Sequence, residues 1–244
     1  MSDDSKPLTP SKKPALAERR SDATEIEAFL RQARAVATPG KANGRLILAL
    51  DATMSRQPTW DLACELQGQM FDAVGKTGRL NVQLVYFRGL GECRASKFVA
   101  DTGALKGLMT SIQCRSGQTQ LGKVLSHALK EAAGSKVDAL VYIGDAMEEN
   151  IDELAEKAGR LGLHGVPAFV FQEGNDAAAE KAFKEIARLS KGAWFRFDRR
   201  AAAALSKLLS AVAVFATGGI KALETRGRPE DLLMIEHLRG SKSP

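Results

Sequence analysis

The sequence predicts an α/β fold: a doubly wound, mainly parallel, Rossmann-like sheet with helices on both faces and one antiparallel edge strand. Three observations support this class. Short apolar runs alternate with longer segments whose apolar residues recur at helical spacing. Glycine and proline residues lie between many of these segments, as turns require. Hydrophobic residues make up 44% of the chain and aromatic residues only 6%, which suits an aliphatic core between a sheet and its helices.

Length and charge limit the organisation and the partners. At 244 residues and 26.2 kDa, the chain has room for one large α/β domain with tails or for two small domains, and we expect one domain. The formal charge of +6 arises from 35 basic and 29 acidic residues, and the basic residues are scattered. Nucleic-acid binding is not indicated, because a phosphate footprint needs basic residues gathered on one face.

The cysteines indicate neither disulfides nor zinc. Cys64, Cys93 and Cys114 are odd in number, lie far apart and form no Cys-x-x-Cys pair. Reduced thiols of this kind are typical of cytosolic proteins, so we expect a cytoplasmic location. The polar N-terminus has no apolar segment behind it and therefore does not resemble a secretory signal.

The N-terminal region divides into two parts. Residues 1–20 contain three prolines and almost no large apolar side chains, so we expect a disordered tail. Residues 21–44 are predicted to form a helix and a linker, because Ile26, Phe29 and Leu30 follow helical spacing until the chain reaches a proline and a glycine.

The first half of the main domain contains two apolar strands and an edge hairpin. Residues 46–50 and 81–87 are predicted strands, separated by a helix over 59–76 whose apolar residues recur every fourth position. Residues 93–100 follow two glycines and are expected to pair with the second strand as an antiparallel edge. A short helix is predicted over 105–112.

The second half repeats a helix–strand alternation, which predicts right-handed crossovers and a parallel sheet. The expected elements are helices over 120–133, 150–162, 176–190 and 201–220, strands over 137–143, 166–171 and 193–197, and a short amphipathic piece over 232–238.

One apolar run in this half bears on membrane insertion. The run over 208–220, about 13 residues, is too short to span a bilayer, so we interpret it as part of a buried helix and expect no membrane insertion. The predicted main domain covers 45–216, and 217–244 form a C-terminal extension.

Oxygen-bearing side chains alternate on the loop that leaves the first strand. Asp51, Thr53 and Ser55 follow the apolar run over 46–50, and a loop of this kind lets them converge on one point. Carboxylate and hydroxyl oxygens are the ligands that Mg²⁺ or Mn²⁺ prefers. The alternative is that Asp51 and Thr53 cap a turn and that Ser55 or Thr59 starts the next helix.

Two further residues are expected at the same place. The carboxyl ends of parallel strands share one edge of the sheet, where ligands bind at a reversal of strand order. Asp145 follows the strand over 137–143, and Thr119 lies at the start of the helix that leads into that strand. If the first strand and this one are neighbours, Asp51 and Asp145 face each other there.

These residues resemble the metal-ion-dependent adhesion site of von Willebrand factor type A domains. The similarity covers roughly residues 44–215 and includes the Asp-x-Thr-x-Ser motif at 51–55, Thr119 in Ser-Gly-Gln-Thr, and Asp145 after an apolar strand. The family's first motif more often has serine where this chain has Thr53. Ala146 follows Asp145 where glycine is common in the family.

The resemblance implies a metal-dependent protein-interaction module rather than an enzyme. Thr53, Ser55 and Thr119 would bind Mg²⁺ (or Mn²⁺) directly or through water, while Asp51 and Asp145 would hold the waters and hydroxyls. An open coordination position would then accept an Asp or Glu side chain of another protein.

Two acidic residues beyond Asp145 have two interpretations. Glu148 and Glu149 either compete for the metal position or are solvated acids in the first turn of a helix, near its positive end.

A nucleotide-hydrolysing enzyme is the main alternative function. Residues 117–124 fit Gly-x-x-x-x-Gly-Lys, but Val124 stands where the magnesium-binding serine or threonine belongs, and no convincing strand runs into Gly117. Asp145 would then act as the accompanying acid. Thr53 stands where a phosphotransferase with a nucleophilic Asp51 usually has a second aspartate.

Histidine catalysis has little support in the sequence. His127, His164 and His237 lack suitably spaced acids and nucleophiles.

Overall fold

The computed structural model describes residues 44–57, 80–197 and 202–240. The predicted tail over 1–20, the helix and linker over 21–44 and the helix over 59–76 therefore lie outside the described residues, apart from Gly44 itself.

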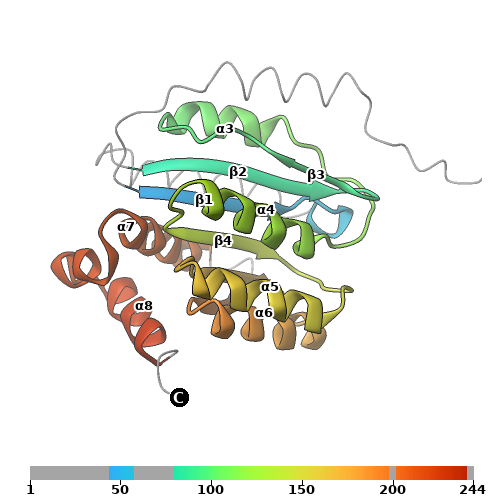
Figure 1. Ribbon diagram of the computed structural model, residues 1–244. Coiled ribbons are helices and arrows are strands. Elements are labelled where there is room, and N and C mark those ends of the chain that lie inside the picture. Colours follow the sequence, from blue (N-terminus) through green and yellow to red (C-terminus); the bar gives the residue numbers. More distant parts are fainter. Residues whose placement is uncertain (1–43, 58–79, 198–201, 241–244) are drawn as a thin grey trace, which may run out of the picture.

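A six-stranded sheet forms the centre of the molecule, as the sequence predicts (Figure 1). Its strand order is β3-β2-β1-β4-β5-β6, and every neighbouring pair is parallel except β2 and β3. The strands are β1 (Gly44–Asp51), β2 (Leu80–Arg88), β3 (Glu92–Ala95), β4 (Ala139–Gly144), β5 (Ala168–Glu173) and β6 (Ala193–Phe197). The antiparallel edge strand is confirmed, and the order reverses direction between β1 and β4.

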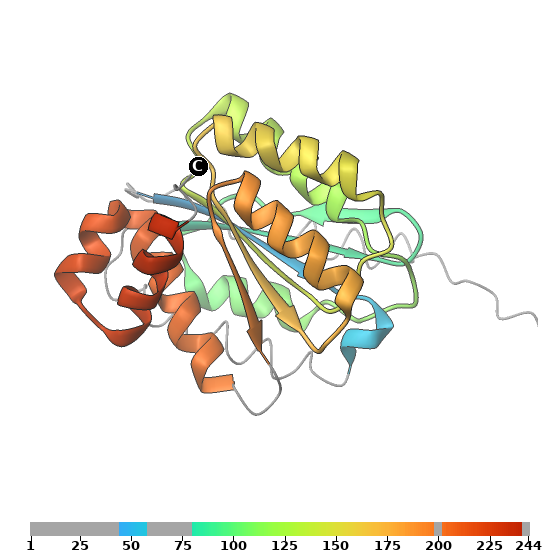
Figure 2. The ribbon, with the colours of Figure 1, turned by 90° about the horizontal axis from the view of Figure 1, so that it is seen from below.

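Helices cover both faces of the sheet, which is why its central strands are apolar on both sides. Figures 1 and 2 show one layer formed by α4 (Leu121–Gly134), α5 (Ile151–Leu163) and α6 (Ala177–Leu189). The opposite layer contains α3 (Thr102–Thr110) and α7 (Ala202–Arg226), with α8 (Pro229–Gly240) packed against α7. Along β1, Leu46, Leu48 and Leu50 enter one core cluster, and Ile47 and Ala49 enter the other, as the two-residue period of a strand requires.

Side chains that the sequence places at helix starts act as caps. Asn150 Oδ1 accepts hydrogen bonds from the backbone of Asp152 (2.8 Å) and Glu153 (3.4 Å) at the start of α5. Asp176 Oδ1 accepts from the backbone of Ala179 (2.6 Å) at the start of α6. Both satisfy donors that a helix leaves unpaired in its first turn.

Helix α7 consists of two helical segments joined by a kink at Gly219, and the first segment ends close to the predicted helix end at residue 220. The segment that passes a length test for membrane spanning is longer than the apolar run 208–220 and includes this kink. Helix α7 continues past residue 220 to Arg226 through a glycine pair, with non-helical backbone at Gly219 (φ 64°, ψ −161°). The segment 203–226 is long and apolar enough to cross a membrane by length and composition, a test that core helices of soluble proteins also pass. Leu209, Val212 and Leu223 of α7 are buried in the core cluster beneath the sheet.

Helix α8 belongs to the same core. Its residues Met234, Ile235 and Leu238 are buried in the cluster that contains α7. An ion pair between the buried Asp231 and the half-buried Arg226 joins the two helices, and Arg226 also donates to Ser210 Oγ (2.8 Å).

Candidate metal site at the carboxyl edge of the sheet

The loop after β1 brings the first three candidate oxygens together. Asp51 Oδ1 accepts a hydrogen bond from the backbone of Thr53 (2.8 Å), and Thr53 Oγ1 lies 3.0 Å from Ser55 Oγ. Asp51 therefore does form the turn that the alternative interpretation expected, but with only one of its two oxygens. Ser55 is exposed within a short 3₁₀ turn, Met54–Arg56.

The carboxylate of Asp51 lies in an environment that disfavours its negative charge. The residue is 1% exposed, and its Oδ2 atom has no hydrogen-bond partner among the residues that the structure describes. Burial raises the pKa of Asp51 to about 6, and the charge of Asp145 adds to this; hydrogen bonds from Thr53 and the charge of Arg56 act in the opposite direction. A nearby cation would stabilise the ionised form.

Asp145 lies at the end of the neighbouring strand. β1 and β4 pair in parallel with Leu50 opposite Ile143, so Asp51 and Asp145 leave adjacent strand ends at the reversal of strand order. Asp145 Oδ1 is also buried without a hydrogen-bond partner in the described part of the chain. The condition that the sequence left open, that these strands are neighbours, is met.

Thr119 is buried and held by an acidic side chain. Its backbone N–H donates to Glu148 Oε2 (3.0 Å), its hydroxyl donates to the same oxygen (2.8 Å), and the backbone N–H of Glu148 donates to Thr119 Oγ1 (3.3 Å). A hydroxyl has one donor and two lone pairs, so one lone pair of Thr119 Oγ1 is left for another ligand. Thr119 lies in the loop before α4, whose first residue is Leu121.

Glu148 and Glu149 have roles that neither interpretation of the sequence foresaw. Both lie before α5 and not in its first turn, because that helix begins at Ile151. Glu148 binds Thr119, and Glu149 accepts from the backbone of Leu121 (2.5 Å) and Gly122 (2.9 Å) at the start of α4. Glu149 therefore lies at the positive N-terminal end of α4, and not of the helix α5 that follows it. This contact holds the loop after β4 against α4.

The sequence analysis missed Arg56 and Glu173. Arg56 immediately follows Ser55, is 1% exposed, and forms an ion pair with Glu173 at the end of β5. The signal in the sequence was its position directly after the Asp-x-Thr-x-Ser motif. In the structure, its burial indicates that it needs a partner, because arginine is rarely buried unless it is paired.

The residues at this edge suit a hard divalent cation. They offer two carboxylates, each with a buried oxygen that lacks a hydrogen-bond partner, and hydroxyls from Thr53, Ser55 and Thr119. No group of three or more His, Cys, Asp or Glu residues in the described ranges could hold a metal by itself. Any metal here would depend on the hydroxyls.

The segment that resembles a phosphate-binding loop has a different context. Helix α3 and an irregular stretch precede Gly117, where a phosphate-binding loop requires a strand. Lys123 Nζ donates to the backbone carbonyl of Gly91 (2.9 Å) and to Gln120 Oε1 (2.9 Å), so its ammonium group fastens α4 to the β2–β3 turn.

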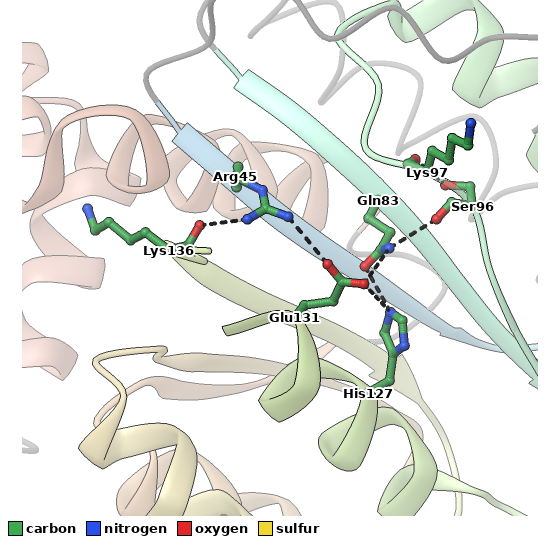
Figure 3. Close-up of polar contacts among 7 residues, drawn as sticks. All are labelled: Arg45, Gln83, Ser96, Lys97, His127, Glu131 and Lys136. Atoms are coloured by element: carbon green, nitrogen blue, oxygen red, sulfur yellow. Dashed lines mark hydrogen bonds and ion pairs between the residues drawn. The ribbon is translucent and has the colours of Figure 1, made fainter. Parts of the chain in front are cut away.

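A second polar cluster lies between α4 and the strands β1 and β2 (Figure 3). His127 Nε2 lies 2.9 Å from Gln83 Oε1 and 3.8 Å from Glu131 Oε1. Arg45 pairs with Glu131 (3.3 Å) and stacks over Phe98 (3.9 Å to the ring centroid). Each of these polar groups contacts another group of the protein, so we interpret the cluster as packing contacts between α4 and the sheet.

Comparison with known proteins supports the fold. No protein-family model matches the chain, and no curated protein matches it. A von Willebrand factor type A protein from Catenulispora acidiphila has a TM-score of 0.57 at 15% identity, covering 72% of this chain and 43% of that one. The vWF domain of the type V pili tip protein Mfa5 from Porphyromonas gingivalis has a TM-score of 0.58 at 12% identity, covering 73% of this chain and 97% of that one.

A third structure carries a metal. It is proximal thread matrix protein 1 from the mussel byssus, described with a zinc-occupied metal-ion-dependent adhesion site (MIDAS) motif. Its TM-score is 0.54 at 17% identity, covering 71% of this chain and 46% of that one. The chain thus spans less than half the length of two of these three structures. At such identities the similarity establishes the fold: this chain has the architecture of von Willebrand factor type A domains.

Proposed function

We propose that this chain is a metal-dependent protein-interaction module that binds an acidic side chain of a partner protein at the carboxyl edge of its sheet. The observation that carries the proposal is the pair of buried carboxylate oxygens, Asp51 Oδ2 and Asp145 Oδ1, which lack hydrogen-bond partners among the described residues. They lie at adjacent strand ends, beside hydroxyls of the type that hard cations prefer.

The residues have distinct roles in this proposal. Thr53, Ser55 and Thr119 supply neutral oxygen ligands for Mg²⁺ or Mn²⁺. Asp51 and Asp145 orient the hydroxyls and waters around the ion. When bound, the ion would offer an open coordination position to an Asp or Glu carboxylate, because neutral ligands leave most of its positive charge uncompensated. Glu148 orients the Thr119 hydroxyl.

Two similar structures and the contacts of Lys123 support a binding module rather than an enzyme. The Mfa5 structure is described as a pilus tip protein and the mussel protein as a thread matrix protein. Lys123, the residue that would bind phosphates in a nucleotide hydrolase, is hydrogen-bonded to protein oxygens. We also propose a cytoplasmic location, on the pattern of scattered cysteines, of which Cys93 and Cys114 are free thiols.

Calorimetry with Mg²⁺ and Mn²⁺ tests the metal site. Asp51→Ala should abolish binding of both ions, because it removes a carboxylate that orients the site. Thr119→Ala should weaken metal binding more than folding, because loss of a neutral hydroxyl leaves no charge uncompensated. Thr53→Ser is the matched control and should bind as the wild type does, since it keeps the ligand atom.

A pull-down in Mg²⁺ and in chelator then tests the interaction. Partner binding that survives both chelator and Asp51→Ala would refute the metal bridge. Binding of labelled ATP or GTP that is lost in Lys123→Ala would instead favour the nucleotide hydrolase.

A further inference from the structure

Arg56 joins the ends of two strands that are not neighbours. It lies in the loop after β1, and its guanidinium forms an ion pair with Glu173, the last residue of β5. β4 lies between these two strands in the sheet, and Asp145 directly follows its end. Three strands that are adjacent in the sheet, β1, β4 and β5, thus each carry a carboxylate at the carboxyl end: Asp51, Asp145 and Glu173. The guanidinium of Arg56 lies at the same edge as these three carboxylates.

The charges at this edge act on one another. Burial lowers the pKa of Arg56, while the negative charges of Asp145 and Asp51 raise it. Arg56 in turn lowers the pKa of Asp51. Arginine keeps its proton in proteins even when it is buried, so the site contains a permanent positive charge.

We propose that Arg56 is a resident cation of this edge: its guanidinium balances Asp51 and Asp145 when no metal is bound, and its positive charge weakens the binding of a divalent cation. The first half of the proposal is independent of the proposed function, and the second half rests on it. Removing the cation from a buried cluster of charges leaves the buried carboxylates uncompensated, which is strongly destabilising. Two cations near the same carboxylates repel each other, so each reduces the affinity for the other.

The competing explanation is that Arg56 compensates the charge of Glu173 alone and only holds the loop after β1 against β5. The two explanations differ in which carboxylate becomes unfavourable after Arg56 is removed. If Arg56 balances the site, neutralising Asp145 should relieve the defect. If it serves Glu173 alone, only neutralising Glu173 should do so.

Urea unfolding in chelator makes this comparison without any metal. The variants of the full chain are Arg56→Met, Arg56→Met with Asp145→Asn, and Arg56→Met with Glu173→Gln. We expect Arg56→Met to lower the unfolding midpoint and Asp145→Asn to restore a substantial part of the loss. If Arg56→Met does not fold, the same rescue is scored as recovery of folded protein by circular dichroism. Rescue by Glu173→Gln but not by Asp145→Asn, or by neither, would overturn the proposal.

Calorimetric titration with Mg²⁺ and with Mn²⁺ tests the second half. Arg56→Met should bind at least one of these ions about tenfold more tightly than the wild type, because it lacks the repelling charge. Arg56→Lys, which keeps the charge, should not gain affinity. Equal affinity in the wild type and in Arg56→Met would overturn this half and leave the proposed function intact. Binding of neither ion by any of the three proteins would overturn this half and the proposed function together, while the rescue in chelator would still decide the first half.

Discussion

Thr119 and Glu148 bind each other reciprocally: the threonine hydroxyl and amide donate to the glutamate carboxylate, and the glutamate amide donates back to the hydroxyl. This contact joins the loop before α4 to the loop after β4. Glu149 reinforces it by capping α4 from the same loop. The candidate threonine ligand is thus positioned by the residues that follow the candidate aspartate.

Removing the Glu148 carboxylate should loosen the Thr119 hydroxyl. We expect Glu148→Ala to weaken Mg²⁺ binding by about tenfold, because groups that orient metal ligands commonly have effects of this size. The amide of Thr119 should also exchange its hydrogen faster, which is a readout that needs no metal. Glu153→Ala, at an exposed acid on α5, is the control and should change neither quantity. Unchanged metal affinity and unchanged exchange in Glu148→Ala would contradict this role.

The close approach of two loops depends on a glycine. A Cβ atom at Gly117 would lie 2.2 Å from the carbonyl oxygen of Gly89, in the β2–β3 turn. Gly117→Ala should therefore destabilise the fold by about 1–3 kcal/mol, since the backbone has to move apart. Gly107→Ala in α3, where nothing lies within 4 Å, is the control. It should be stabilising by about 0.5–1 kcal/mol, because alanine favours a helix over glycine. Thermal unfolding of both variants measures the difference.

The polar cluster in Figure 3 should make stability fall at mildly acidic pH. Burial lowers the pKa of His127; Glu131 opposes this effect and Lys130 adds to it. The unfolded chain therefore binds a proton more readily than the native state. Stability from this group is present above the unfolded pKa of about 6.5 and is lost as the pH falls below it.

Urea unfolding at pH 7.5 and 5.5 tests the histidine effect. His127→Gln keeps a side chain that can reach Gln83 and does not titrate, so it should lose less stability between the two pH values than the wild type. His164→Gln, in an exposed turn, should behave as the wild type does. An identical pH dependence in all three proteins would exclude His127 as the cause.

The ion pair between Arg226 and the buried Asp231 should hold α8 on the core. Asp231 is 0% exposed and accepts from Arg226 Nε (2.7 Å) and from the backbone of Arg228 (3.0 Å). Arg226→Met should cost about 3–5 kcal/mol, because it leaves the Asp231 carboxylate buried without its cation. Arg239→Met breaks an exposed pair with Glu224 and should cost less than about 1 kcal/mol. Similar melting temperatures for the two variants would contradict the assignment.

Several structural features follow from local sequence patterns. The alternation along β1 and the caps at Asn150 and Asp176 were visible because strand period and helix capping depend on residues close in sequence. The positions of Asp51 and Asp145 at strand ends followed from the same patterns. The second segment of α7 did not, because the glycine pair at 218–219 is typical of a helix end, whereas in the structure the chain kinks at Gly219 and resumes a helix to Arg226.

The sequence by itself determined the alternating α/β class, the antiparallel edge, and the placement of a candidate aspartate at or just after the end of each of two strands. Only the tertiary structure decided that β1 and β4 are neighbours, that Glu149 caps a helix other than its own, and that Arg56 reaches Glu173. The physical reason is that periodicity and capping are properties of short segments, whereas these contacts depend on the order in which strands pair. Strand order brings side chains far apart in the chain to one edge, and there burial determines which charges need a partner.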